Sequence, residues 1–107
     1  MKKQQDRMDI KYIAIAELKA RSQNARTHPE KQIGKLTESV HRFGFTTPIL
    51  IDADQTVIAG HGRIEAAKRL GMTELPTIRL DHMTEAEIRA YVIADNKLAE
   101  LAGWDDD

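Results

Sequence analysis

Four consecutive residues, Gly60, His61, Gly62 and Arg63, form the segment of this chain best suited to bind an anion. They follow a short β-branched run and precede an amphipathic stretch, so the sequence predicts a strand-to-helix turn. Glycine lets the backbone approach a ligand closely, and the first amides of a helix direct partial positive charge outward. Arg63 adds a bidentate donor for phosphate, and His61 adds a further hydrogen-bond donor. The segment therefore predicts a phosphate-binding turn, although similar glycine turns occur in proteins that bind no nucleotide.

Length and composition bound the class of protein. The chain has 107 residues, enough for one domain with a modest core, and 41% of its residues are hydrophobic and 31% charged. Its sequence contains neither an apolar run long enough to span a bilayer nor a secretory signal pattern. Cysteine is absent, which excludes disulfides and thiolate chemistry. We therefore expect a cytoplasmic protein that does not contact a membrane.

The two ends of the chain carry opposite charge. Residues 1–26 hold seven basic and three acidic side chains, whereas residues 81–107 hold two basic and eight acidic ones. A chain with this asymmetry lacks the continuous basic face that is typical of a general DNA-binding surface. We therefore expect any contact with DNA to be local or to be made by a fused or associated module.

Stretches rich in β-branched and apolar residues predict the strands. The first is expected at residues 10–15, and another at 75–80. Residues 47–51 and 56–59 flank the polar sequence Asp52–Gln55, a pattern that favours a hairpin with a tight turn.

Capping patterns and glycines predict the first two helices. Thr27 and Glu30 have the spacing of a capping box, Pro29 suits a first helical turn, and Gly44 marks the end of that helix. The second helix is expected over residues 62–70, directly after the glycine turn.

A third helix is predicted from a second capping box, formed by Thr84 and Glu87. Its apolar residues change register near Asp95-Asn96, so we expect a break or tight bend there, with Leu98 as a further inward residue.

The order of these elements and four short motifs together resemble the ParB/sulfiredoxin superfamily, and specifically the ParB-like N-terminal domains that are fused to DNA-modification methyltransferases or occur in phage and plasmid proteins. The resemblance spans nearly the whole chain. The motifs, in order, are Asn24-Ala25-Arg26, Phe45-Thr46-Thr47-Pro48-Ile49, Ala59-Gly60-His61-Gly62-Arg63 and Ala94-Asp95-Asn96-Lys97-Leu98-Ala99-Glu100.

This resemblance implies an α+β fold, with a small mixed β-sheet flanked by about three helices. It places the ParB-like domain at residues 10–104, after a disordered lead over residues 1–9 and before an acidic tail at 105–107. The resemblance is also compatible with a homodimer.

The resemblance implies that the glycine turn holds a nucleoside triphosphate. In ParB proteins the corresponding turn reads Gly-Glu-Arg-Arg and grips the triphosphate of CTP. Gly60 and Arg63 match its first and last residues, while His61 and Gly62 replace the middle pair. Loss of one guanidinium from a phosphate clamp forfeits about 1.5–3 kcal/mol, so the nucleotide is left open between CTP and ATP.

Further ligands are implied by matching positions elsewhere. Asp95 and Asn96 correspond to a Glu-Asn pair that helps hold a divalent metal, here expected to be Mg²⁺. Arg26, from the loop before the first helix, could close over the ligand, and Thr47 is assigned to the same site. The pair Lys68-Arg69 lies past the first helical turn, where we expect solvent-exposed side chains.

Three alternatives belong to the same fold. Sulfiredoxin carries its catalytic cysteine at the position of His61, so its chemistry is excluded here. Phosphoryl transfer, by an NTPase or a small-molecule kinase, stays open, although Ala59 stands where free-serine kinases carry an aspartate. A metal-dependent nuclease would need clustered carboxylates, and the candidates are Asp52, Asp54 and Asp95, of which the first two are better explained as turn residues. We favour a nucleotide-binding module that regulates a DNA-acting partner.

Overall fold

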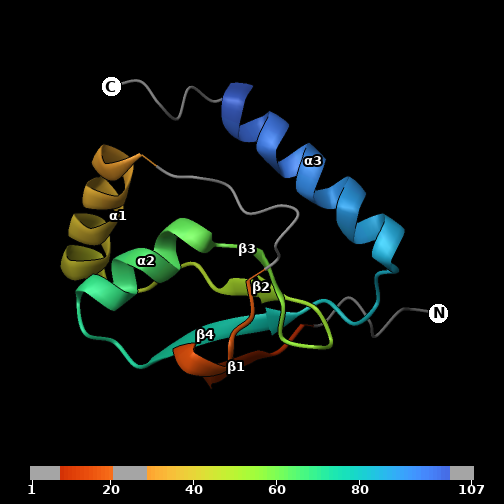
Figure 1. Ribbon diagram of the computed structural model, residues 1–107, viewed down its shortest axis with the longest axis horizontal. Helices are drawn as coiled ribbons and strands as arrows, with labels where there is room; N and C mark the ends of the chain where they lie inside the picture. The colour runs from red at the N-terminus through yellow and green to blue at the C-terminus, as the bar shows by residue number, and fades with distance from the viewer. Residues whose placement is uncertain (1–7, 21–28, 102–107) are drawn as a thin grey trace.

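The computed structural model of the protein describes residues 8–20 and 29–101. Arg26, Thr27, the acidic tail and most of the expected N-terminal lead lie outside these described residues. The elements in chain order are β1 (Ile10–Ala14), the 3-10 turn η2 (Ile15–Glu17), α1 (Glu30–Phe43), β2 (Ile49–Ile51), β3 (Val57–Ala59), α2 (His61–Arg69), β4 (Glu74–Arg79) and α3 (Glu85–Leu101), shown in Figure 1.

Within the described residues, four strands form one mixed sheet in the order β1-β4-β2-β3. The central strand β4 runs antiparallel to β1 and parallel to β2, and β2 forms an antiparallel hairpin with β3. The hairpin turn is held by Asp52, whose Oδ1 accepts hydrogen bonds from the amides of Asp54 (2.8 Å) and Thr56 (3.0 Å). These findings confirm the predicted α+β class, the strands and the role of Asp52 as a turn residue.

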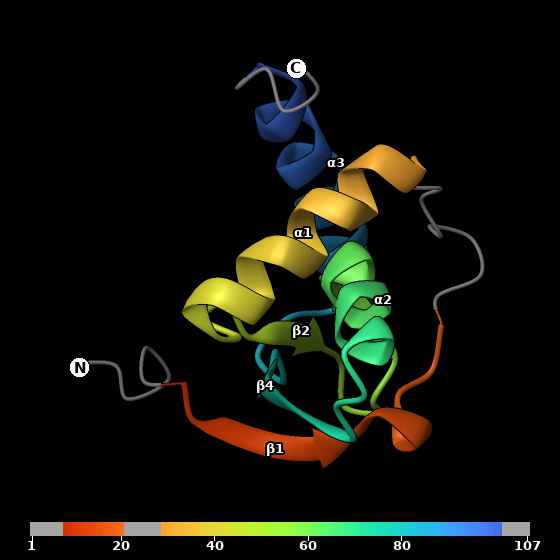
Figure 2. The same ribbon diagram turned by 90° about the vertical axis from the view of Figure 1, so that its left-hand side faces the viewer.

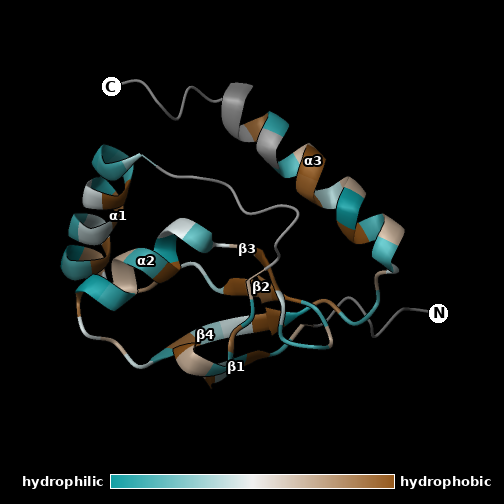
Figure 3. Ribbon diagram, in the orientation of Figure 1, coloured by the Kyte–Doolittle hydropathy of each residue, from teal (hydrophilic) through white to brown (hydrophobic). Residues whose placement is uncertain are grey.

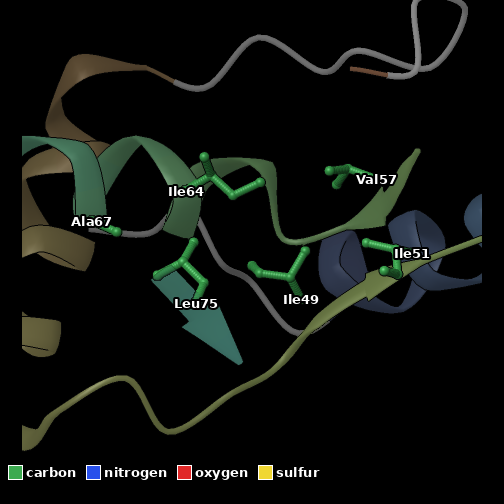
Figure 4. Close-up of a cluster of buried hydrophobic side chains, with 6 residues drawn as sticks. All are labelled: Ile49, Ile51, Val57, Ile64, Ala67 and Leu75. Atoms are coloured by element: carbon green, nitrogen blue, oxygen red, sulfur yellow. The ribbon is translucent and has the colours of Figure 1, made fainter. Parts of the chain in front are cut away.

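Alternate residues of each strand point to opposite faces of the sheet, and the central strands carry apolar side chains on both faces. Helices therefore cover both faces. On one face, α1 packs against α2, and α2 packs against the strands (Figure 2). The core on this side, drawn in Figure 4, consists of Ile49, Ile51, Val57, Ile64, Ala67 and Leu75.

The first half of α3 covers part of the opposite face. Its buried residues Ile88 and Val92 pack with Ile58 and Leu80, and Leu50 and Ile78 lie against this cluster. Figure 3 shows the resulting pattern, with hydrophobic residues concentrated on the central strands and hydrophilic ones on α1. None of the helices in the described part of the chain is long and apolar enough to cross a bilayer.

Two predicted helix boundaries are correct, namely the start of α3 and the end of α1, whereas the predicted start of α1 is wrong. The Thr84–Glu87 capping box is confirmed, with reciprocal hydrogen bonds of 2.8 and 3.1 Å. Gly44 ends α1 as predicted, at a φ of 90°. The start of α1 differs, because Pro29 is the N-cap, with extended backbone, and does not lie inside the first helical turn. Glu30 is therefore the first helical residue, and its carboxylate contacts Arg69 of α2. Thr27, its predicted capping-box partner, lies outside the described residues.

The break predicted near Asp95-Asn96 is also wrong, because α3 continues without interruption to Leu101. Only its first half packs on the sheet, and beyond Val92 the helix extends past the sheet edge (Figure 1). Leu98 is accordingly 65% exposed. The change in apolar register therefore marks the end of packing, since Asp or Asn inside a helix costs no more than about 0.7 kcal/mol and does not break it.

The junction between β3 and α2 requires glycine. Gly60 has a φ of 112°, and a Cβ atom placed there would lie 2.5 Å from Cδ1 of the fully buried Ile49. Left-handed strain costs about 1–2 kcal/mol and overpacking about 1–3 kcal/mol. We therefore expect Gly60→Ala to lower the free energy of unfolding by about 2 kcal/mol or more, measured by urea denaturation.

Gly71→Ala provides the matched control, because Gly71 also has a left-handed φ, 78°, but no atom within 4 Å of the added Cβ. It should cost about 1–2 kcal/mol, for the strain alone. Equal losses for the two variants would show that the contact with Ile49 does not matter.

Candidate functional site

The site is built around the first turn of α2. The first helical hydrogen bond joins the Ile64 amide to the Gly60 carbonyl at 3.0 Å, so the amides of residues 61–63 precede the regular ladder. The N-cap residue is Gly60, and no side chain caps this end. Such an end carries partial positive charge and suits a bound anion. Gly62 is buried, while His61 and Arg63 are half-buried.

A cleft of about 390 Å³ opens beside this turn. It lies between α2, the start of α1 and the segment around η2, and its floor is apolar. The apolar lining residues are Ile15, Leu18, Ala20, Ile33, Val57 and Ile64. Because Ile33, Val57 and Ile64 are buried core residues, the floor of the cleft is part of the packed fold.

Charged side chains line the rim of the cleft. Lys68 lies 3.6 Å from Glu65 on the same helix, measured from Nζ to Oε2. Arg69 makes a two-pronged contact with Glu30 of α1, with Nη1–Oε2 at 2.6 Å and Nη2–Oε1 at 2.7 Å. Lys19 also lines the cleft. The rim therefore holds three cations and two carboxylates, and its net charge favours an anionic ligand only slightly.

The contact between α1 and α2 shifts the protonation of both partners. The hydrogen bond and charge of Arg69 hold the pKa of Glu30 below its ordinary value, and the hydrogen bond from Glu30 raises the pKa of Arg69. Both side chains reach solvent, so the pair is a surface ion pair that screening by salt weakens.

Helix periodicity separates the predicted phosphate ligands. His61 lines the cleft together with residues 64, 65, 68 and 69, which form one face of α2. Arg63 follows His61 by two residues, about 200° around the helix axis, and it is not among the cleft residues. In the sequence His61 and Arg63 are grouped by adjacency alone, and Lys68-Arg69 are predicted to be exposed to solvent. Those two side chains are indeed exposed, yet they also line the cleft, as the spacing i, i+3, i+4, i+7 from His61 could have indicated.

The predicted metal ligands lie elsewhere in the fold. Asp95 is exposed on α3, which packs on the opposite face of the sheet from α2. It lies near Tyr91, whose pKa is raised by burial and further by the Asp95 charge. Asn96 belongs to the same helix, and its side chain lies outside what the structure describes.

Thr47 is exposed in the bend before β2, and Arg26 lies outside the described residues. Among the described residues, no group of three or more His, Asp or Glu is arranged to hold a metal ion. Magnesium often binds through one or two carboxylates together with substrate phosphates. Asp95 could therefore be a ligand only of a magnesium ion that is coordinated mainly by the phosphates of a bound nucleotide.

Comparison with known proteins relates the chain to one family. The model of the ParB N-terminal domain family matches residues 1–97. The ParB-like nuclease domain-containing protein YnaK of Escherichia coli K12 is 42% identical over 82 residues, which are 77% of this chain and 94% of YnaK. The probable chromosome 2-partitioning protein ParB of Deinococcus radiodurans is 28% identical over 92 residues, 82% of this chain but 31% of that protein.

Solved structures confirm the fold. ParB of Caulobacter crescentus, complexed with CTP-gamma-S, superposes with a TM-score of 0.70 at 24% identity, over 82% of this chain and 52% of that one. Sulfiredoxin from Arabidopsis thaliana gives 0.64 at 18% identity, over 78% and 97%. A free serine kinase in complex with AMP gives 0.59 at 23% identity, over 72% and 33%.

The ion pair between Glu30 and Arg69 should stabilise the fold only while Glu30 is ionised. Because the pKa of Glu30 is lowered on folding, this stabilisation is complete above the ordinary value of 4.5 and is lost as the pH falls through the lower folded-state pKa. We expect Glu30→Gln to lower the melting temperature slightly at pH 7 and to leave it unchanged near pH 3. Glu38→Gln, at an exposed position on the same helix, is the control. A pH-independent loss would assign the effect of Glu30 to packing.

Proposed function

Because the chain belongs to the ParB N-terminal domain family, we propose that it is a cytoplasmic module that binds a nucleoside triphosphate, CTP or ATP with Mg²⁺, at the start of α2. Two structural neighbours support this choice of ligand, since one was solved with CTP-gamma-S and the other with AMP. The bound nucleotide would regulate a DNA-acting partner, such as a fused or associated methyltransferase or partitioning module. The relation to the partitioning protein of D. radiodurans supports that context, although this chain spans under a third of it.

One observation carries the proposal. A helix of nine residues begins directly on a left-handed glycine, has no side-chain cap, and places His61 at its first position beside a cleft. A side-chain carboxylate or hydroxyl at the cap would compete with a phosphate for the helix amides, and here the cap position has no side chain. The helix end can therefore accept phosphate oxygens without first displacing a cap.

The side chains around this helix end would divide between two flanks of the ligand. His61 and Lys68 lie on the cleft flank, and Arg63 lies on the opposite flank of the same turn. A polyphosphate can bridge such flanks because its charged oxygens extend over several bonds. In this arrangement the amides after Gly60 and the Arg63 guanidinium hold the β- and γ-phosphates, with Arg26 as a further cation.

Magnesium would be bound chiefly by the phosphate oxygens. The assignment of Asp95 and Asn96 as its protein ligands rests on the family resemblance alone, since α3 packs on the opposite face of the sheet from α2. When bound, the ion neutralises phosphate charge. The protein residues need only bind and position the nucleotide, because a regulatory switch requires binding and release of the nucleotide and no cleavage of it.

Nucleotide binding can be measured directly by isothermal titration calorimetry, with CTP, ATP, GTP and ADP in the presence of Mg²⁺. We expect at least one triphosphate to bind, and Arg63→Ala to weaken it about ten- to a hundredfold, through loss of a charge-assisted hydrogen bond. His61→Ala should weaken it about fivefold, as expected for a neutral hydrogen bond.

Arg89→Ala is the matched control, because Arg89 is an exposed arginine on α3 that pairs with Glu85. It should leave the affinity unchanged. Affinities that are equal for the wild type and Arg63→Ala would remove Arg63 from the site, and the absence of binding by every nucleotide would overturn the proposal.

Asp95→Asn distinguishes the switch from a phosphoryl-transfer enzyme, the alternative favoured by the AMP-bound kinase neighbour. For a switch, we expect no release of inorganic phosphate from CTP or ATP, and a shift of binding toward higher Mg²⁺ in the variant. Asp54→Asn, at the exposed tip of the hairpin turn, is the control. Turnover by the wild type that Asp95→Asn abolishes would establish the enzyme instead.

A further inference from the structure

The edge strand β1 exposes an apolar stripe. Ile10 and Tyr12 are 55% and 65% exposed and share one face of β1, and Met8, which lies two residues before the strand, is 48% exposed. Large apolar side chains in a contiguous row at a sheet edge indicate a contact surface.

No helix in the described part of the chain covers this stripe. Ile10 and Tyr12 are in register with Ile78 and Pro76 of β4, so all four lie on the face of the sheet to which α3 docks. However, α3 packs beside β3, at the opposite edge (Figure 1). The width of the sheet therefore separates α3 from β1.

The backbone of β1 can also accept another strand. Within the described residues β1 pairs with β4 alone. The Lys11 carbonyl faces β4, because it accepts a 2.7 Å hydrogen bond from Oγ1 of Thr77. Successive residues of a strand direct their polar groups to opposite edges, so the N–H and C=O groups of Ile10 and Tyr12 face outward.

We propose that β1 pairs antiparallel with β1 of a second copy of this chain, about a two-fold axis at Ile10. This register follows from the sequence Met8-Asp9-Ile10-Lys11-Tyr12, which is complementary to itself when reversed. In the dimer, residues 8 and 9 continue the extended course of β1. Ile10 then faces Ile10 of the second copy, Met8 faces Tyr12, and Asp9 faces Lys11 on both sides of the axis. Directly opposite side chains in such a pair lie about 4.5–5.5 Å apart, within reach of ion pairing and apolar contact.

The charge pattern selects a second copy over an unrelated strand. Asp9 and Lys11 are both exposed, and the two-fold arrangement places each beside an opposite charge. A two-fold interface also repeats each contact, so a short strand provides two ion pairs and three apolar pairs. The sheets of the two copies become continuous, which closes the open edge of each. This dimer is independent of the proposed nucleotide site, which lies at α2.

Charge variants test the register by sedimentation equilibrium without nucleotide, from micromolar to millimolar protein. The wild type should dimerise reversibly. Lys11→Asp places Asp opposite Asp, and Asp9→Lys places Lys opposite Lys, so each variant should dimerise at least about tenfold more weakly. An equimolar mixture of the two variants restores both opposite-charge pairs, and it should form a heterodimer with an affinity near that of the wild type.

Lys35→Asp, at an exposed position on α1, makes the same change of charge away from β1 and should leave dimerisation intact. Circular dichroism melts would verify that the β1 variants fold. A monomeric wild type at millimolar concentration overturns the proposal. So does a dimer that neither variant weakens, or a mixture that associates no better than its components.

Discussion

The close approach of Gly60 to Ile49 is the constraint on which the site depends. Because position 60 lacks a Cβ atom, the chain can turn through a left-handed conformation directly above β2 and begin α2 at once. This turn fixes the rotation of α2 about its own axis. Ile64 and Ala67 then enter the core, and His61 and Lys68 reach the rim of the cleft. Core packing and the placement of the candidate ligands are therefore set by the same contact.

The rotation of α2 has a chemical consequence. Adjacent residues of the turn lie on different flanks of the helix end, and only the backbone amides are common to both. A small anion could contact one flank, whereas a polyphosphate is long enough to contact both. The balanced charge of the rim points the same way, since the ion pairs Glu30–Arg69 and Glu65–Lys68 already satisfy part of its cations. Recognition would therefore depend on geometry at the helix end more than on net positive charge.

Sequence patterns predict the features of this fold that arise from local interactions. The strands, the Asp52 turn, the Thr84 capping box and the glycine helix ends are all determined by residues a few positions apart. The contact of Glu30 with Arg69 joins positions 39 residues apart, so no local pattern could reveal it. The continuous α3 was missed for a similar reason. Its apolar pattern ends where the helix passes the edge of the sheet, and the position of that edge depends on the tertiary fold.

The candidate site divides in the same way. Its glycine turn is visible in the sequence, and the family resemblance gave it a ligand, whereas the cleft depends on η2, α1 and α2 coming together. The roles of Arg26, Thr47, Asp95 and Asn96 stay predictions. Thr47 and Asp95 do not line the cleft, while Arg26 and the Asn96 side chain lie outside what the structure describes.

Backbone amide chemical shifts, followed during titration of ¹⁵N-labelled protein with CTP or ATP and Mg²⁺, test the central claim most directly. Phosphate bound at the helix end should shift the amides of residues 60–63 first and most, with smaller changes along the cleft face of α2. Saturable shifts that leave residues 60–63 unaffected and appear on β1 or α3 instead would contradict it.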